Sequence, residues 1–167
     1  NALKNLDSTS IIFTRANADR QGKVINSMID KFAKIHKQNC YVFSSMGYKN
    51  YLSTLKFVDI CLGNSSSGLL EVPVFKKFSI NIGDRQKDRL KAKSVIDVKP
   101  KANIILKTIK NLYNKKIPNK LFNPYGDGYA SKRTYQIIRK LNLENSITNK
   151  FFDMIIWKNL NDLFFVE

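Results

Sequence analysis

Short apolar runs alternate with longer amphipathic stretches along most of the chain. Each run is bounded by polar residues, which is typical of a buried strand. Between the runs, apolar residues recur at the three- and four-residue spacing of a helix. The predicted strands are residues 11–13, 41–43, 60–62, 78–82 and 95–98, and the predicted helices are residues 24–35, 51–57, 104–112 and 129–141, with a short helix opening near residue 68.

Strands that alternate with helices in this way favour βαβ units with right-handed crossovers. Such units build a parallel sheet covered by helices on both faces. We therefore predict an α/β, Rossmann-like fold. The 167 residues can bury one core of ordinary domain size. We assign residues 1–145 to this domain and the amphipathic stretch 146–167 to a C-terminal helical tail.

The composition excludes several classes of protein. With 43% hydrophobic residues, 7 Gly and 4 Pro, the chain is neither disordered nor collagen-like. Cys40 and Cys61 lie in or beside apolar runs, so we expect reduced thiols in the core rather than a disulfide scaffold. No signal-peptide pattern is present, and charged residues interrupt the apolar tail at 151–166. We expect a cytoplasmic protein without a membrane partner.

The net charge is strongly positive. Lys and Arg total 29 against 13 Asp and Glu, a formal charge of +16, which attracts phosphates, nucleic acid or acidic lipid. Drift in an AT-rich genome also produces a Lys-rich composition, so the charge alone chooses none of these. A basic module for RNA or lipid needs clustered cations with interleaved exposed aromatics. Here the cations are dispersed along helices, and we expect the aromatics to lie largely in the cores of strands, so we predict no nucleic-acid partner.

Three polar loops each follow a predicted strand, at residues 14–19, 63–68 and 81–89. The carboxyl ends of parallel strands meet at one sheet edge, where doubly wound folds bind ligands. The loop at 63–68, GNSSSG, is small enough for a phosphate to approach the backbone, and its hydroxyls and the next helix donate hydrogen bonds. The alternative is a Ser/Gly turn whose serine caps the helix.

The other two loops carry charged and amide side chains. Arg85, Lys87 and Arg89 suit a phosphate or carboxylate, or are solvated cations balanced by neighbouring aspartates. Asn17 is placed to bind sugar hydroxyls or to cap the next helix. Glu71 would repel a phosphate but accept hydrogen bonds from a ribose. Serines that can bind a diphosphate lie next to a carboxylate that can bind a ribose. Together they indicate a nucleotide site.

Three segments in this order, residues 63–71, 81–86 and 123–128, resemble the C-terminal half of hydrolysing UDP-N-acetylglucosamine 2-epimerases. These bacterial enzymes act in the synthesis of sialic acids and related nonulosonates. The resemblance extends from about residue 10 to residue 153. It implies the C-terminal domain of a two-domain GT-B fold, with a UDP-sugar bound in the cleft between the domains.

The resemblance also implies a chemistry. Removal of a proton from the second carbon of the sugar and anti-elimination of UDP give a 2-acetamidoglucal, to which water adds with inversion. The products are N-acetylmannosamine and UDP, and no cofactor or metal is required. The implied substrate-binding residues are Ser65 and Ser66 for the diphosphate, Glu71 for the ribose, Arg85 for the phosphate and sugar, Met46 and Tyr51 for the uracil, and Asn17 for the sugar.

The chain departs from the family pattern in several places. The acid and base residues belong to an N-terminal Rossmann-like domain, so the catalytic residues are not assigned. A His-Pro motif on the first strand is absent, and His36 does not match it. Asp88 stands where relatives carry Gly. We therefore expect a fragment that lacks the first strand of its sheet, is weakened and inactive by itself, and partners the N-terminal domain, with a homo-oligomer when complete.

The same residues are also compatible with other functions. UDP-N,N'-diacetylbacillosamine 2-epimerases of legionaminic-acid synthesis carry similar motifs. A GT-B glycosyltransferase would use the same nucleotide site for a different reaction. The alternative outside enzymes is the basic RNA- or lipid-binding module.

Overall fold

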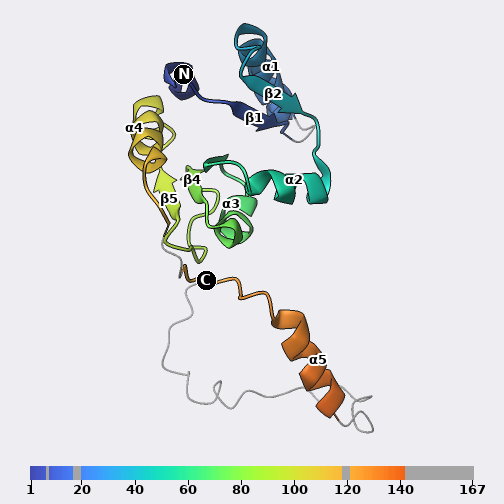
Figure 1. Cartoon of the computed structure of the whole chain (residues 1–167). Helices are drawn as coiled ribbons and strands as arrows, with labels where there is room; N and C mark the ends of the chain where they lie inside the picture. The colour runs from blue at the N-terminus through green and yellow to red at the C-terminus, as the bar shows by residue number, and fades with distance from the viewer. Residues whose placement is uncertain (7, 17–19, 118–120, 142–167) are drawn as a thin grey trace, which may run out of the picture. The chain divides into compact units, whose positions relative to one another are not determined.

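The computed structural model describes residues 1–6, 8–16, 20–117 and 121–141. Its elements alternate as the hydrophobic pattern predicts (Figure 1). The strands are β1 (Ile11–Thr14), β2 (Cys40–Phe43), β3 (Ile60–Gly63), β4 (Phe78–Ile82) and β5 (Val95–Val98). The helices are η1 (Ala2–Asn5), α1 (Arg20–Ile35), α2 (Gly47–Leu55), α3 (Ser67–Leu70), η2 (Val72–Phe75), α4 (Ala102–Tyr113) and α5 (Ala130–Lys140).

The chain divides into two compact units, Asn1–Tyr125 and Gly126–Glu167. The first unit holds all five described strands and every described helix except α5. The domain boundary that we proposed at residue 145, and the tail beyond it, lie outside the described residues.

All described strand pairs are parallel, which confirms the predicted α/β class. They form two sheets rather than one, with the orders β1-β2 and β3-β4-β5. In the first sheet Ile11 is aligned with Cys40, and in the second Gly63 is aligned with Asn81. The division arises because no described strand pairs with both β1 and β3.

The core of the second sheet lies on both faces of β4. Ile80 is fully buried against Val98 and against Ile109 and Leu112 of α4. On the opposite face, Leu69 of α3 packs with Ala92 and Val95. Since successive strand residues point to opposite faces, helices cover this sheet on both sides, as predicted.

The first sheet is less well covered. Phe13 of β1 meets Phe32 of α1 edge to face, with ring centroids 5.8 Å apart, and Phe32 stacks on His36. In contrast, Tyr41 and Phe43 of β2 are 51% and 41% exposed. The expectation that aromatic residues in strands belong to the core is therefore wrong for β2. Both cysteines are free thiols, with Cys40 buried and Cys61 partly buried, as predicted.

Gly68 of α3 lies close to β4. A Cβ atom at this position would lie 2.6 Å from Oγ of Ser79, which is itself buried. We predict that Gly68→Ala destabilises the protein by about 1–3 kcal/mol through overpacking, despite the better helix propensity of alanine. Chemical denaturation followed by circular dichroism measures this change.

Two further variants test that explanation. Gly63→Ala is the matched control, because no atom lies within 4 Å of its added Cβ, and its expected effect is within about 0.5 kcal/mol. Ser79→Ala removes the clashing hydroxyl and should recover most of the loss in the double variant. Equal losses for the single and double variants would contradict the assignment.

Candidate nucleotide-binding site

The loops after β3 and β4 leave the sheet side by side, because the last residues of the two strands, Gly63 and Asn81, are paired. Gln86 joins the two loops: its Nε2 donates to the carbonyl oxygen of Asn64 at 2.9 Å, and its side chain is buried. Gly83 begins the second loop with φ of +74°, a conformation that glycine adopts without strain. The geometry therefore brings together two of the three polar loops predicted from sequence.

The serine-rich loop is held by hydrogen bonds of its own. Oγ of Ser65 accepts from the backbone N–H of Ser67 at 3.4 Å, and the carbonyl of Ser66 accepts from Leu69 at 2.9 Å. The helix that follows is a single turn, Ser67–Leu70, which confirms the predicted short helix and gives it only a small dipole. Ser65 is exposed and Ser66 partly buried.

Helix α2 brings Tyr51 to this loop, where its hydroxyl makes a short hydrogen bond with Oγ of Ser67. Burial raises the pKa of Tyr51. The hydrogen bond with Ser67 lowers this pKa, and the nearby negative charge of Glu71 raises it further. Burial also raises the pKa of Cys61 on β3. At neutral pH the phenol of Tyr51 and the thiol of Cys61 are therefore uncharged, and Glu71 lies at the end of α3.

The remaining predicted residues have different surroundings. Arg85 is exposed and has no hydrogen bond or ion pair within the described part of the chain, so its guanidinium is available to an anion. Met46 is the partly buried residue that precedes α2. Asn17 lies outside the described residues.

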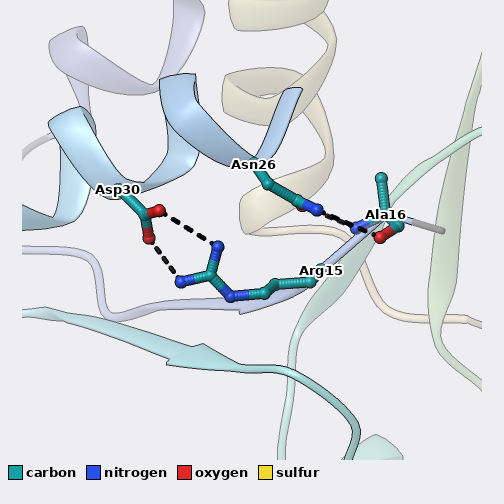
Figure 2. A network of polar contacts seen from close by, with 4 residues as sticks. All are labelled: Arg15, Ala16, Asn26 and Asp30. Carbon is teal, nitrogen blue, oxygen red and sulfur yellow. Dashed lines mark hydrogen bonds and ion pairs between the residues drawn. The ribbon is translucent and has the colours of Figure 1, made fainter. Parts of the chain in front are cut away.

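The chain just before Asn17 is fixed to α1 (Figure 2). Both guanidinium nitrogens of Arg15 bind the carboxylate of Asp30, at 2.5 and 3.1 Å. Asn26 donates to the carbonyl of Ala16 at 3.1 Å and accepts from its N–H at 2.9 Å. The guanidinium hydrogen bond holds the pKa of Asp30 below its ordinary value. Arg15 is thus committed to a structural pair, and the loop after β1 leaves the strand in a defined direction.

Sequence reasoning missed two polar residues of this region, Asn81 and Gln86. Asn81 is buried in β4, where its Nδ2 donates to Oδ1 of Asp97 at 2.6 Å. The amide oxygens of both Asn81 and Gln86 are buried without a partner among the described residues. Both residues fall in the quoted segment 81–86, and a polar residue inside an apolar strand pattern is the signal that would have identified Asn81.

The segment at residues 123–128 has a structural function. Tyr125 donates from its hydroxyl to the carbonyl of Leu90 at 2.9 Å, which holds this segment against the chain that follows β4. Asp127 accepts from the N–H of Tyr129 and pairs with Arg133 of α5, and the guanidinium lowers the pKa of Asp127 to about 2. Asp88, which stands where relatives carry Gly, has φ of +61°, a left-handed conformation that aspartate tolerates better than most residues.

A cavity of about 310 Å³ lies at the other edge of the sheet, between the starts of β3 and β4 and the end of α4. It is lined by none of the predicted site residues. In the described residues, no three His, Cys, Asp or Glu side chains are grouped as metal ligands. None of the described helices combines the length and the apolar character needed to cross a bilayer.

A sequence model described as UDP-N-acetylglucosamine 2-epimerase matches residues 1–139 of the chain. The chain belongs to this family. The match covers both sheets and the whole of the candidate site, so the resemblance inferred from three short segments is confirmed at the level of the family.

Curated relatives in the epimerase family have more than one name. A UDP-N,N'-diacetylbacillosamine 2-epimerase (hydrolyzing) of Legionella pneumophila is 34% identical over 141 residues, 84% of this chain and 36% of the relative. A polysialic acid biosynthesis protein of Escherichia coli is 35% identical over 147 residues, 86% of this chain and 37% of the relative. A GDP/UDP-N,N'-diacetylbacillosamine 2-epimerase (hydrolyzing) of Campylobacter jejuni is 43% identical over 95 residues, 57% of this chain and 25% of the relative.

The fold is also that of the family. A crystal structure of Methanocaldococcus jannaschii UDP-GlcNAc 2-epimerase, in complex with UDP-GlcNAc and UDP, matches with a TM-score of 0.62 at 20% identity. The match covers 78% of this chain and 35% of that one. The chain therefore spans about a third of the length of these proteins, and the parallel α/β architecture is that of part of an epimerase.

We predict that Tyr51→Phe destabilises the protein by about 1 kcal/mol, because it leaves Ser67 without its side-chain partner. Tyr48→Phe is the matched control, since Tyr48 lies on the same helix and is 73% exposed. The raised pKa of Tyr51 means that the unfolded chain ionises first. The contribution of Tyr51 to the free energy of unfolding is thus complete below the ordinary tyrosine pKa of about 10, and it declines as the pH rises beyond that value.

Urea denaturation at several pH values between 7 and 11 measures both effects. The difference between the native protein and Tyr51→Phe should shrink above pH 10, whereas Tyr48→Phe should change little. A constant difference across this range, or equal effects of the two variants, would show that Tyr51 is not held in the site as described.

Proposed function

We propose that this chain forms the UDP-binding part of a hydrolysing UDP-N-acetylglucosamine 2-epimerase, which produces N-acetylmannosamine and UDP for the synthesis of nonulosonates such as sialic acid. The observation that carries the proposal is the hydrogen bond from Gln86 to Asn64. It joins the serine-rich loop and the arginine-bearing loop at the carboxyl ends of paired parallel strands, where this class of sheet binds nucleotides.

In this proposal the two loops divide the nucleotide between them. Ser65 and Ser66 bind the diphosphate through their hydroxyls and the loop backbone, and Arg85 supplies the positive charge. Arg85 suits this role because it is exposed and forms no ion pair with a carboxylate among the described residues. Arg15, in contrast, is already paired with Asp30. Arginine binds phosphate oxygens in a bidentate fork.

The nucleoside contacts the other side of the serine-rich loop. Glu71 accepts hydrogen bonds from the ribose hydroxyls, and Met46 and Tyr51 border the uracil. The hydrogen bond between Tyr51 and Ser67 fixes the aromatic ring relative to the diphosphate loop. Asn17, on the loop that Arg15 and Ala16 anchor, is the proposed sugar contact.

In the proposed reaction, UDP is the leaving group and no cofactor takes part. The bond between the anomeric carbon and the UDP oxygen breaks as a base removes the proton from the second carbon. Negative charge accumulates on the departing diphosphate, where Arg85 and the loop N–H groups stabilise it. Water then adds its hydroxyl to the anomeric carbon and a proton to the second carbon from the opposite face. The sugar is neither oxidised nor reduced overall, so the proposal includes no redox cofactor.

The acid and base groups come from outside residues 1–167 in this proposal. We assign them to an N-terminal Rossmann-like domain that closes over the sugar, and we propose a homo-oligomer for the complete enzyme. The prediction is that an enzyme assembled from both domains releases UDP and a sugar inverted at its second carbon, with no acceptor. Residues 1–167 alone are the control and should give no turnover. A requirement for an acceptor would instead indicate a glycosyltransferase.

A second substrate is supported by the relatives, two of which are named as diacetylbacillosamine 2-epimerases. Here the substrate would be UDP-N,N'-diacetylbacillosamine and the residues of this chain would bind the same UDP. Parallel assays of the assembled enzyme with both UDP-sugars, with products identified by mass spectrometry, separate the two. The substrate with the higher kcat/KM is the one to which the site is adapted.

We predict that Glu71→Ala and Arg85→Ala each weaken UDP binding roughly ten- to a hundred-fold, because each removes a charged hydrogen-bond partner. Binding to residues 1–167 is expected to be weak, so chemical shifts of the ¹⁵N-labelled chain should be followed with UDP up to millimolar concentrations. Asp59→Ala and Arg139→Ala are the controls: both residues are exposed, Asp59 lies at the other sheet edge, and Arg139 is on α5. Unchanged affinity in both site variants would reject the assigned site.

A further inference from the structure

The cavity of about 310 Å³ at the starts of β3 and β4 has no part in the proposed function. Its apolar wall is set by the fold. Ile60 and Phe78, the first residues of these strands, are paired, and both pack against the core cluster that contains the buried Leu112 of α4. All three side chains line the cavity. Since core packing holds them in place, the cavity is preformed, and its volume suits a small ligand.

Four lysines line the same cavity, and we call it the lysine cavity. Lys76 and Lys77 lie between η2 and β4, and Lys115 and Lys116 follow α4, so the fold brings together two segments that are far apart in the chain. Lysines make up four of the ten described lining residues, whereas Lys and Arg together make up 29 of the 167 residues of the chain. The composition alone therefore does not account for the positive charge gathered here.

These lysines are not neutralised by neighbouring acids. None of the four forms an ion pair within the described part of the chain. Among the described residues that line the cavity, Asp59 is the single carboxylate, so four positive charges stand against one negative charge. A concave surface lined by charges of one sign concentrates ions of the opposite sign. The lysine cavity is thus suited to attract an anion.

Helix capping explains only half of this arrangement. Lys115 and Lys116 follow Asn114, the C-cap of α4, where lysine interacts favourably with the last carbonyl groups of the helix. Lys76 follows a 3₁₀ helix of only four residues and has φ of +54°, a left-handed conformation in which glycine is the usual residue. A lysine in this conformation is strained. The strain at Lys76 is accounted for if its charged side chain has a function.

We propose that the lysine cavity binds an oligophosphate, with its phosphoryl groups held by the ammonium groups of the four lysines. Lysine binds phosphate as a compact point charge, and several lysines suit several phosphoryl groups better than one carboxylate. The phosphoryl groups belong either to an inorganic chain or to a nucleotide. For a nucleotide, the apolar wall and the side chain of Tyr113, which is 60% exposed and also lines the cavity, are available to contact the base.

This cavity is separate from the candidate nucleotide site. The two lie at opposite ends of β3 and β4, because the strands begin at the cavity and end at the serine-rich loop and the loop after β4. The three residue steps of β3 span about 10 Å. Salt largely screens exposed charges at that separation. The proposal therefore does not rest on the proposed function, and either one can fail without the other.

Titration of ¹⁵N-labelled residues 1–167 with inorganic tripolyphosphate, at pH 7 and about 0.1 M salt, tests the binding. The amides of residues 59–60, 76–78 and 112–117 should shift and saturate, whereas those of residues 63–68 should change little. Sulfate is the control anion and should bind at least about ten-fold more weakly, because it engages fewer of the lysines. Unshifted cavity amides, or equal affinities for the two anions, would overturn the proposal.

The variant that tests the lysines replaces all four of them by glutamine. Its affinity for tripolyphosphate should fall at least about twenty-fold, from about two- to five-fold for each exposed charge. The matched control removes the same net charge from exposed lysines that do not line the cavity, by substituting glutamine at Lys31, Lys34, Lys107 and Lys132. The control should stay within about two-fold of the unsubstituted chain. Equal losses in the two variants would show a general effect of charge and contradict the assigned site.

Two single substitutions separate binding from stability. Lys76→Gly relieves the left-handed strain, so it should raise the midpoint of thermal unfolding by about 2–4 °C. The same variant should weaken tripolyphosphate binding about two- to five-fold. Asp59→Asn removes the opposing carboxylate and should strengthen tripolyphosphate binding by a similar factor, with UDP binding at residues 63–68 unchanged. Unchanged tripolyphosphate affinity in both variants would count against the proposal.

The source of the phosphoryl groups is determined by comparing ATP with tripolyphosphate at the cavity amides. Tighter binding of ATP, lost in Tyr113→Ala, would identify a nucleotide, and equal affinities would identify the inorganic chain; both outcomes support the proposal. Single-stranded RNA and vesicles that contain acidic lipid are the macromolecular alternatives. If either shifts the cavity amides at a lower concentration than both phosphate compounds, and the glutamine variant abolishes the effect, a small oligophosphate is the wrong ligand.

Discussion

The hydrogen-bonded pairing of β4 with β3 and β5 is the constraint on which the rest of this structure depends. It buries Ile80 against α4 on one face and brings Ser79 against Gly68 of α3 on the other. It also sets the loops after β3 and β4 side by side, where Gln86 joins them. Without parallel pairing in this register, the two loops would not share one edge of the sheet.

The site built on this pairing combines neutral polar groups beside the serine-rich loop with charged side chains on the loop after β4. Burial keeps the phenol of Tyr51 and the thiol of Cys61 in their neutral forms, and the serine-rich loop offers hydroxyls and backbone N–H groups. Arg85, Lys87 and Arg89 of the loop after β4 are exposed cations without an ion pair among the described residues. The large positive charge of the chain therefore says little about the site, because most of it is spread over exposed lysines.

Family membership and strand order support each other. The family model covers residues 1–139, which include both parallel sheets, β1-β2 and β3-β4-β5. In the proposed function, the nucleotide site depends on the N-terminal domain for its acid and base groups.

The sequence by itself determined the strands and helices to within a few residues, the parallel α/β class, the free cysteines and the family. These follow from local periodicity, which reports which side chains are buried, and from short ordered motifs. Only the tertiary structure decided that the strands divide into two sheets, that Tyr51 bonds to Ser67 and that Gln86 bonds to Asn64. The physical reason is that such contacts join residues far apart in the chain, and periodicity carries no information about which partner a polar group will meet.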